Sequence, residues 1–339
     1  MMLEEQVALT STLRLPARAR WYAEIDDVSE LTALLARPAL REYPLTVLGE
    51  GSNVVLRDDL PGLVLRPRLR GMRIVEWRGS AALVECQAGE SWDDLVQWTI
   101  DQGLAGLENL SLIPGSVGAA PFQNIGAYGV ELADLFDSLD ACSLEQGRIQ
   151  RFSLAQCQFA YRDSFFKSVE PGRWLINTVR LWLDRERAPV LGYADLAGRF
   201  AALPNEQRNA AGLRALICAL RRSKLPDPAR LANAGSFFKN PVVDAVVHAR
   251  LREQFPALVS YPQADGSFKL AAGWLIEQAG WKGKRVGNVG MHAAQALVLV
   301  NYAEATGAEV LAFAGQVRQS VLERFSVLLE QEPVILPPL

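Results

Sequence analysis

The sequence predicts an α+β fold with more than one core. Half of its 339 residues are hydrophobic, which is enough for two or three domains. Short apolar runs of strand length alternate with amphipathic helical stretches. The glycine turn Gly49–Val54 follows one such run, but Val54 stands at the third glycine position of G-x-G-x-x-G and another strand follows. We therefore expect no doubly wound dinucleotide fold.

The N-terminal half predicts two α+β lobes. The first has a helix over 27–36 and strands over 45–48, 54–56 and 63–65. The second has a strand over 82–87, a helix over 92–102 that ends at Gly103, and strands over 132–144, 148–153 and 174–183.

The character of the chain changes after about residue 212. A helix over 213–220 is followed by the proline-broken segment 223–228, which is typical of a linker. Beyond it we expect helices over 244–254, 271–278 and 304–322 and a strand over 296–300. A last alternating strand is expected from Phe325 to Pro333, which would place Glu330 and Glu332 on one face.

Two glycine-rich loops are the main functional signal. Residues 113–131 read IPGSVGAAPFQNIGAYGVE, and 48–54 read LGEGSNV. Glycine permits positive φ and lets successive N–H groups form an anion nest, although a small-residue turn packed against a strand explains one such loop equally well. Two loops about sixty residues apart suit an extended dinucleotide better than a single phosphate.

Composition excludes several classes of function. The net charge is −3, and the basic runs 66–70 and 221–224 are interpreted as solvated faces, so no nucleic-acid partner is expected. No apolar run approaches the roughly 18 residues of a membrane span, and no leader is recognised, so we expect a cytoplasmic protein. The four cysteines are widely spaced core residues, and only two histidines are present, so no metal site is predicted.

Two polar segments remain open to more than one reading. Residues 161–164, YRDS, fit either a salt-bridged turn or an arginine presented to an anion. Residues 233–241, NAGSFFKNP, place small donors next to a lysine, which suits a phosphorylated or carboxylated ligand, but an ordinary turn before a strand edge has the same composition.

Taken together, GEGSN at 49–53, PGSVGAAPFQNIGAYGVE at 114–131, YRDS, KLPDP at 224–228, NAGSFFKNP and YPQADGSFKLAAGWLI at 261–276 resemble one family. It is the UDP-N-acetylenolpyruvoylglucosamine reductase family, also called UDP-N-acetylmuramate dehydrogenases. The resemblance implies an FAD-binding domain of the vanillyl-alcohol-oxidase type and a smaller α+β substrate-binding domain. The implied boundaries are 1–70 and 71–222 for the two FAD-binding lobes, 223–323 for the substrate domain and 324–339 for a returning C-terminal strand.

The resemblance also implies the cofactors and their contacts. FAD would be bound without a covalent link, because neither loop contains His or Cys, and NADPH would be the co-substrate. The implied FAD contacts are Gly49, Glu50, Gly51, Ser52, Asn53, Pro114, Gly115, Ser116, Val117, Gly118, Ala119 and Gly126.

By the same resemblance, hydride from NADPH reaches the enolpyruvyl double bond of UDP-N-acetylglucosamine enolpyruvate by way of the flavin. Arg162 and a C-terminal glutamate would stabilise charge at the carboxylate, and Ser236 would donate the proton. Glu332 is the aligned glutamate and Glu330 the alternative. Substrate contacts are expected from Tyr128, Tyr193, Lys224, Lys239, Asn240 and Lys269, and the protein is expected to be a monomer.

Three segments depart from the family pattern. An N-terminal Asn-Thr-Phe-type motif appears as Ser11-Thr12-Leu13, alanines stand at 119 and 120 where serines are common, and Pro333-Val334 follow Glu332 with no arginine. The alternatives considered are another flavin oxidase of the same fold, a flavin-binding protein without catalysis, and a purely structural protein. Arg162, Ser236 and a terminal carboxylate disfavour the second, since FAD binding alone requires none of them.

Overall fold

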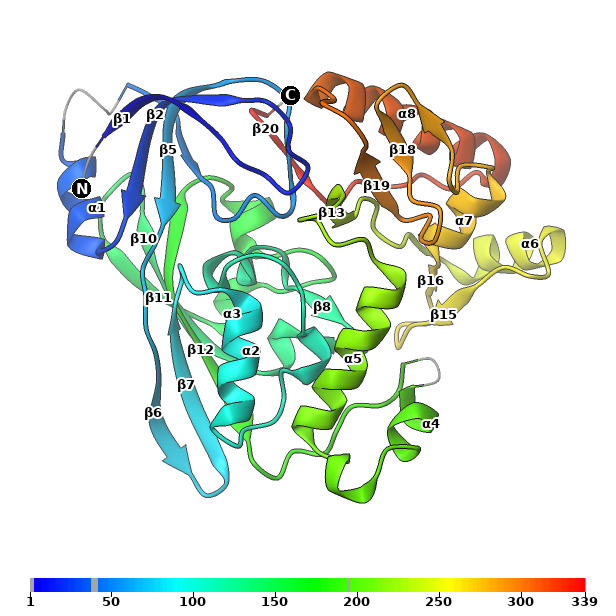
Figure 1. The fold of residues 1–339 in the computed structure, drawn as a ribbon, viewed down its shortest axis with the longest axis horizontal. Helices are drawn as coiled ribbons and strands as arrows, with labels where there is room; N and C mark the ends of the chain where they lie inside the picture. The colour runs from blue at the N-terminus through cyan, green and yellow to red at the C-terminus, as the bar shows by residue number, and fades with distance from the viewer. Residues whose placement is uncertain (1–2, 38–41, 194–195, 339) are drawn as a thin grey trace. The chain divides into compact units, whose positions relative to one another are not determined.

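The computed structural model describes residues 3–37, 42–193 and 196–338. The chain divides into two compact units. The first unit comprises Met1–Val7, Ala19–Glu50 and Leu60–Ser223, and the second comprises Ala8–Arg18, Gly51–Asp59 and Lys224–Leu339. Each unit is thus assembled from three separate stretches of chain, which Figure 1 shows by colour.

The first unit begins with a mixed four-stranded sheet. Its order is β1 (Glu4–Ala8), β2 (Arg18–Ile25), β5 (Leu60–Pro67) and β3 (Leu45–Val47), with β2 and β3 parallel to β5. Helix α1 (Val28–Leu35) starts at Asp27, whose side chain accepts a 2.7 Å bond from the Ser29 N–H. Leu31 and Leu34 of α1 are buried with Leu63 and Leu65 of β5. The helix and strands predicted here are confirmed.

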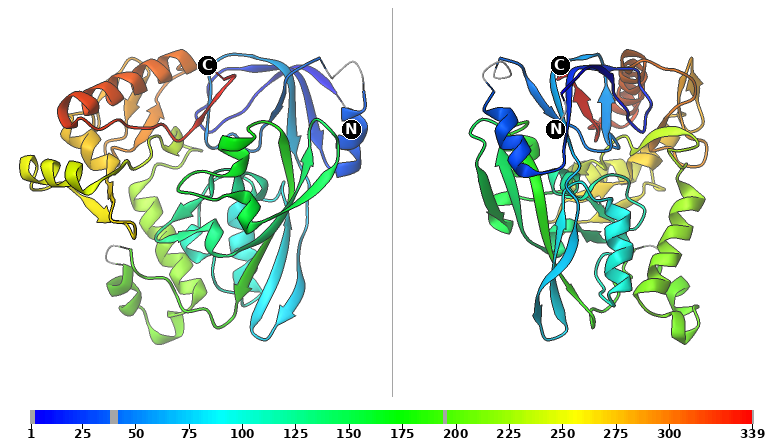
Figure 2. Two further views of the ribbon diagram at one scale, coloured as in Figure 1. Left: turned by 180° about the vertical axis from the view of Figure 1, so that it is seen from behind. Right: turned by 60° about the vertical axis from the view of Figure 1, so that its left-hand side comes forward.

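A second, antiparallel sheet forms the centre of this unit. Its order is β11 (Ile149–Ser153), β10 (Phe136–Ser143), β12 (Trp174–Asp184), β7 (Ala81–Gln87) and β6 (Met72–Arg78). Helix α2 (Trp92–Asp101) lies beside this sheet (Figures 1 and 2). Its Trp92 and Leu95 belong to the same buried cluster as Val84 and Leu181 of the sheet. The sequence reading omitted β6, and the strand expected from 132 begins at Phe136, because Leu132–Asp134 form a 3₁₀ turn, η5.

Short elements and one long helix complete the first unit. Helix α5 (Ala210–Lys224) extends the predicted 213–220 helix at both ends and buries Leu213 and Ile217 against Leu196 and Phe200 of α4 (Leu196–Ala201). The remaining elements are η2 (Glu108–Leu110), η3 (Val117–Ala119), η4 (Pro121–Gln123), β8 (Gly126–Ala127), β9 (Val130–Glu131), α3 (Leu154–Cys157), η6 (Phe165–Val169) and η7 (Asn205–Gln207).

The second unit contains a four-stranded and a three-stranded sheet. The first has the order β13 (Ala232–Ser236), β19 (Val298–Asn301), β18 (Val289–Met291) and β17 (Arg285–Val286), and the second β14 (Val242–Val243), β16 (Phe268–Leu270) and β15 (Ser260–Pro262). Its helices are α6 (Ala245–Gln254), α7 (Ala272–Gln278) and α8 (Gly307–Phe325). Strands β4 (Val54–Leu56) and β20 (Val334–Leu336) pair in parallel, so the C-terminal residues join the segment 51–59.

The C-terminal expectation needs correction. Phe325 belongs to α8, and the residues after it form no strand before β20 except for a single bridge between Gln331 and Phe238. Side-chain burial does alternate along this segment, since Val327 and Leu329 are buried while Leu328 is exposed. The pattern therefore predicted which side chains point inward but not the hydrogen bonding.

The four cysteines, Cys86, Cys142, Cys157 and Cys218, are buried free thiols, as expected of core residues. Within the described ranges, no helix is both long and apolar enough to cross a membrane.

Candidate functional site

The two glycine-rich loops meet inside the first unit. Gly49 follows β3, and a Cβ atom added to it would lie 3.0 Å from the Ser116 hydroxyl oxygen and 3.9 Å from the Ala119 methyl carbon. Glycine at position 49 therefore lets the first loop lie directly against the second. Two segments that are more than sixty residues apart in the sequence thus form one surface of bare backbone.

Backbone donors at this junction are available for a ligand. Within the described part of the chain, the N–H groups of Gly49, Glu50, Gly115 and Ser116 donate to no acceptor. A cluster of such N–H groups is the arrangement that binds phosphate oxygens. Gly115 has a φ of +123°, which favours glycine there.

Three other amides of the same loop are already in use. Val117 donates to the Glu90 carbonyl and Gly118 to the Ala88 carbonyl, each at 2.9 Å, and Ala119 donates to the Ser116 carbonyl at 3.0 Å. A Cβ atom at Gly118 would lie only 2.5 Å from the Ala88 side chain. Gly118 thus serves tight packing, while Gly115 and Ser116 keep their donors, so both readings of the loop apply to different residues.

Gly51 to Asn53, the rest of the first loop, belong to the second unit. The Thr12 N–H donates to the Gly51 carbonyl at 3.1 Å, and the Thr12 hydroxyl contacts the Gly51 and Ser52 carbonyls at 3.4 Å. The Val334 N–H donates to the Asn53 carbonyl at 3.0 Å. Thr12, from the segment where the family motif is altered, therefore still fixes the backbone of this loop.

Arg162 occupies a tight turn in the first unit. Ala160 and Asp163 exchange two 3.1 Å backbone hydrogen bonds, and Arg162 between them has a φ of +56°. Its guanidinium donates to the Gly126 carbonyl at 2.5 Å, while the Asp163 carboxylate accepts from Ser164 and Ser168. A Cβ atom at Gly126 would lie 3.0 Å from the Arg162 guanidinium. Gly126 is thus required for Arg162 to cross the second glycine loop.

Tyr128 and Tyr193 are brought together. Tyr128 and Gly129, both with positive φ, form the two-residue turn of the β8–β9 hairpin. The rings of Tyr128 and Tyr193 meet edge to face with centroids 5.1 Å apart. Burial raises the pKa of Tyr128, an effect that the nearby Arg221 guanidinium opposes.

Arg221 is a residue that sequence reasoning misassigned. It was interpreted as part of a solvated basic run, but its Nε atom is buried and has no hydrogen-bond partner among the described residues. The guanidinium donates to the Leu112 carbonyl at 3.3 Å, and its burial lowers its pKa. The signal that could have found it is helical spacing, since Arg221 follows the buried Leu213 and Ile217 of α5 at intervals of four residues. The other residues of the run, Arg222 to Lys224, are exposed as expected.

In the second unit, Ser236 ends β13 beside a register shift against β19. The buried Asn233 shapes this end, because its side-chain oxygen accepts from the Gly235 N–H at 2.9 Å and Gly235 has a φ of +70°. The Ser236 hydroxyl forms no hydrogen bond to any described residue and is half-buried. This hydroxyl is therefore available to a ligand.

The C-terminal segment runs antiparallel beside residues 237–239. The Glu332 N–H donates to the Phe237 carbonyl at 2.9 Å, and the Lys239 N–H donates to the Glu330 carbonyl at 2.8 Å. Glu332 therefore lies opposite the residue next to Ser236, whereas Glu330 lies opposite Lys239. The Glu330 carboxylate is 70% exposed and pairs with the Lys239 ammonium at 2.8 Å.

The remaining predicted substrate contacts are spread over the second unit. The Asn240 side-chain oxygen accepts a 2.9 Å hydrogen bond from the N–H of Ala272, the first residue of α7. Lys269 lies on the central strand β16, opposite Val242 and Tyr261. Lys224 is the exposed last residue of α5. No cluster of three or more His, Cys, Asp or Glu side chains suited to a metal occurs in the ranges that the structure describes.

These features fit a phosphate-bearing cofactor in the first unit. Four N–H groups without acceptors supply donors, the missing Cβ of Gly49 permits close approach between the loops, and Arg221 supplies a buried cation whose Nε lacks a partner. A buried guanidinium is costly unless an anion or acceptor satisfies it, so an anionic group beside Leu112 would lower that cost.

Comparison with known proteins agrees with this geometry. Residues 19–153 match the family described as "FAD binding domain", and residues 227–336 match "UDP-N-acetylenolpyruvoylglucosamine reductase, C-terminal domain". The predicted fold class, α+β with an FAD-binding domain and a smaller α+β domain, is confirmed.

Curated relatives are identical to this chain at about half of the aligned positions. The enzyme named "UDP-N-acetylenolpyruvoylglucosamine reductase" from Pseudomonas aeruginosa is 53% identical over 333 residues, covering 98% of each chain. That of Pseudomonas fluorescens is 52% identical over 316 residues, covering 93% of each. The solved UDP-N-acetylenolpyruvylglucosamine reductase from Thermus caldophilus has the same fold, with a TM-score of 0.66 at 24% identity over 96% of each chain. The chain belongs to the UDP-N-acetylenolpyruvoylglucosamine reductase family.

Proposed function

We infer that this protein is an FAD-dependent oxidoreductase that reduces UDP-N-acetylglucosamine enolpyruvate to UDP-N-acetylmuramate with NADPH, in peptidoglycan precursor synthesis. The observation that carries this conclusion is the junction of the two glycine loops, with its N–H groups of Gly49, Glu50, Gly115 and Ser116, in a chain whose family has this activity. Four clustered amide donors suit the pyrophosphate of FAD.

FAD, when bound, supplies the hydride chemistry, and the chain supplies binding and orientation. We assign the pyrophosphate to the amides of Gly49, Glu50, Gly115 and Ser116. The other predicted contacts shape this region: Gly118 packs on Ala88, and Gly126 lies under Arg162. Gly51, Ser52, Asn53, Pro114, Val117 and Ala119 remain assigned as flavin contacts by resemblance.

Three side chains are assigned to the reduction of the enolpyruvyl group. Addition of hydride to the terminal carbon leaves negative charge that the adjacent carboxylate shares, so a cation at this carboxylate lowers the barrier. Arg162 is the cation, and its left-handed turn fixes the direction of its guanidinium. Ser236 donates a proton to the neighbouring carbon, and its hydroxyl has no competing partner in the described part of the chain. Glu332 is the carboxylate that supports this transfer.

The choice of Glu332 over Glu330 rests on register. Glu332 lies opposite Phe237, next to Ser236, while the Glu330 carboxylate pairs with Lys239 and faces solvent. The UDP-sugar is assigned to Tyr128, Tyr193, Lys224, Lys239, Asn240 and Lys269, which together offer aromatic faces, three ammonium groups and an amide for a diphosphate and a sugar.

We further propose that the protein works in the cytoplasm as a monomer. Four free, buried thiols are in keeping with a reducing compartment, where disulfides are rare. Light scattering of the purified protein measures the oligomeric state. The lobe and domain boundaries at residues 70, 222 and 323 also stay predictions, for which limited proteolysis is the measurement.

An anaerobic spectroscopic titration tests the proposed function. The purified holoprotein is expected to lose its flavin absorbance on addition of NADPH and to regain it on addition of UDP-N-acetylglucosamine enolpyruvate. Bleaching without recovery would exclude this substrate and favour a different flavin reductase or oxidase. A protein that retains no flavin would refute the cofactor assignment itself.

A further inference from the structure

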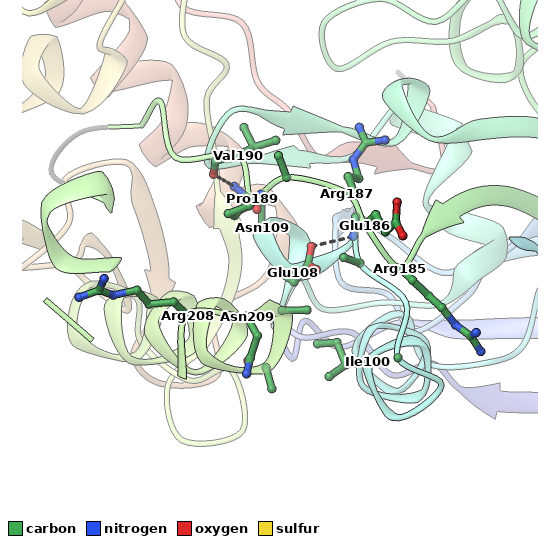
Figure 3. A pocket seen from close by; sticks show the side chains of 16 residues that line it. Ile100, Glu108, Asn109, Arg185, Glu186, Arg187, Pro189, Val190, Arg208 and Asn209 are labelled. Atoms are coloured by element: carbon green, nitrogen blue, oxygen red, sulfur yellow. Dashed lines mark hydrogen bonds between the residues drawn. The ribbon is translucent and has the colours of Figure 1, made fainter. Parts of the chain in front are cut away.

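A buried amide links the two segments that carry Tyr128 and Tyr193. Asn109 lies in η2 and is 1% exposed. Its side-chain nitrogen donates to the Tyr128 carbonyl at 2.8 Å and to the Val190 carbonyl at 2.9 Å, the second of which Figure 3 shows. The amide thus donates one hydrogen bond to each of two backbone carbonyls that are 62 positions apart in the chain.

Each of these backbones needs the restraint. Tyr128 has a φ of +50°, a conformation that costs a non-glycine residue free energy and persists only where its surroundings enforce it. Segment 185–190 lines a cavity of about 570 Å³ together with Asn109 itself, Gly106, Glu108 and Asn209 among others (Figure 3). The bond from Asn109 to the Val190 carbonyl therefore acts together with the packing of the Val190 side chain against the core to hold the end of this segment.

The two anchored segments place the tyrosines face to edge. Val190 precedes Tyr193 by three residues, and the Tyr193 ring meets the Tyr128 ring with centroids 5.1 Å apart. Leu191 and Tyr128 also pack against the apolar cluster of α4 and α5. A shift of either backbone would change this edge-to-face contact between the rings.

We propose that Asn109 is a positioning residue that sets the Tyr128–Tyr193 pair for the sugar nucleotide. It touches neither tyrosine ring in its hydrogen bonds and acts through the two carbonyl groups. This inference rests on the proposed function, because that function makes the two tyrosines substrate contacts.

The test uses Asn109→Ser, which removes the amide that donates both bonds, and Asn109→Asp, which turns a carboxylate toward two carbonyl oxygens. Loss of both bonds is expected to raise the KM for UDP-N-acetylglucosamine enolpyruvate about tenfold with a smaller change in kcat. The FAD content per folded protein should stay unchanged. Asn205→Ser, the same change at an exposed position of the first unit, is the control and should leave both constants unaltered.

A double mutant separates positioning from general damage. In a Tyr193→Ala background, Asn109→Ser should change KM by less than about twofold, because the ring that Asn109 positions is gone. An equal increase in KM in both backgrounds would overturn the proposal. The proposal would also be overturned if the variant lost FAD and folded protein while the remaining active fraction kept the wild-type KM.

Limited trypsin digestion gives a readout that does not depend on activity. Arg185 and Arg187 are exposed in the anchored segment, so Asn109→Ser should speed cleavage there several-fold relative to Asn205→Ser. Unchanged cleavage would refute the anchoring. If the wild-type protein does not turn over the substrate, the proposed function fails, and the digestion still decides whether Asn109 holds the segment.

Discussion

At the scale of single residues, the candidate site holds several non-glycine residues in left-handed conformations. Asn124, Tyr128 and Arg162 have φ values of +45°, +50° and +56°. Such residues cost about 1–3 kcal/mol each and persist where surrounding bonds fix them. The Asn124 amide bonds Glu131 at 2.7 Å and Ala160 at 3.2 Å, which ties the second glycine loop to the turn of Arg162. Two of these three residues, Tyr128 and Arg162, are the ones assigned to the substrate.

The first residue-scale prediction concerns Ser236. Ser236→Ala removes the proposed proton donor, which is not among the residues assigned to FAD. Flavin reduction by NADPH should be unchanged, whereas reoxidation by the enolpyruvyl substrate should slow by about 10²–10⁴-fold, the usual size of a general acid's contribution. Stopped-flow absorbance measures the two half-reactions separately. Ser267→Ala, at an exposed turn of the same unit, is the matched control. Equal loss of both half-reactions would contradict the assignment.

A second prediction distinguishes the two glutamates. Glu332→Gln should slow the second half-reaction by about 10²-fold or more, because it removes the carboxylate that we propose supports proton transfer from Ser236. Glu330→Gln should change it by less than about threefold, since an exposed ion pair such as that with Lys239 contributes little. The same stopped-flow assay serves both variants. A larger effect from Glu330→Gln would reverse the assignment.

At the scale of elements, a row of alternating charges crosses the whole five-stranded sheet. Arg73 of β6 bonds Glu85 of β7, Arg180 of β12 bonds both Glu85 and Asp140 of β10, and Arg151 of β11 bonds Asp140. The separations are 2.6–2.8 Å, and Arg180 is 8% exposed. Each strand thus contributes one member, so the row favours this strand order and register over others.

Removing the central member should destabilise the sheet most. Arg180→Ala leaves Glu85 and Asp140 without their buried partner, which costs about 3–5 kcal/mol of unfolding free energy. Arg73→Ala removes a side chain that is 71% exposed and should cost less than about 1 kcal/mol. Denaturant titrations of the two variants at pH 7 make the comparison. Similar losses from both variants would show that the row does not act through its buried centre.

The same row predicts a dependence on pH. Burial alone would raise the pKa of Glu85 and of Asp140, but hydrogen bonds from the arginines outweigh it and both pKa values are lowered. Their contribution to stability is therefore present above the unfolded pKa of about 4 and is lost as pH falls through the folded value. The stability difference between the wild type and Arg180→Ala should narrow between pH 7 and pH 3. A difference that stays constant over this range would contradict the charge-based explanation.

At the scale of the whole molecule, sequence patterns predicted the helices and strands better than they predicted which of them pack or pair together. The helices over 28–35, 92–101 and 245–254 follow from apolar spacing and from caps at Asp27, Ser91 and Asp244, all of which are local signals. Strand β6 was missed because, as an edge strand, most of its side chains are exposed, which weakens the apolar alternation.

Long-range relations could not be predicted from local patterns. The pairing of β4 with β20 joins residues about 280 positions apart, and only the folded chain shows it. Likewise, the spacing of Glu330 and Glu332 could not show which residues they lie opposite; in the fold, Glu330 lies opposite Lys239 and Glu332 opposite Phe237. The burial of the Arg221 Nε atom depends on which face of α5 packs against the rest of the unit. The basic residues beside it in the sequence suggested an exposed position instead.

The last prediction concerns FAD and the stability of the whole chain. A ligand that binds only the folded protein stabilises it by about 2.7 kcal/mol at one hundred times its Kd, which corresponds to a rise in Tm of about 4 °C for a chain of this size. Adding FAD to apoprotein should therefore raise the Tm measured by differential scanning fluorimetry of the tryptophans. FMN, which lacks the adenosine half and the pyrophosphate link, should raise it much less, because the junction of the loops at Gly49 and Ser116 offers donors for a pyrophosphate. An equal shift with FMN would mean that these loops do not select the dinucleotide, and no shift with either flavin would remove the cofactor on which the proposed activity depends.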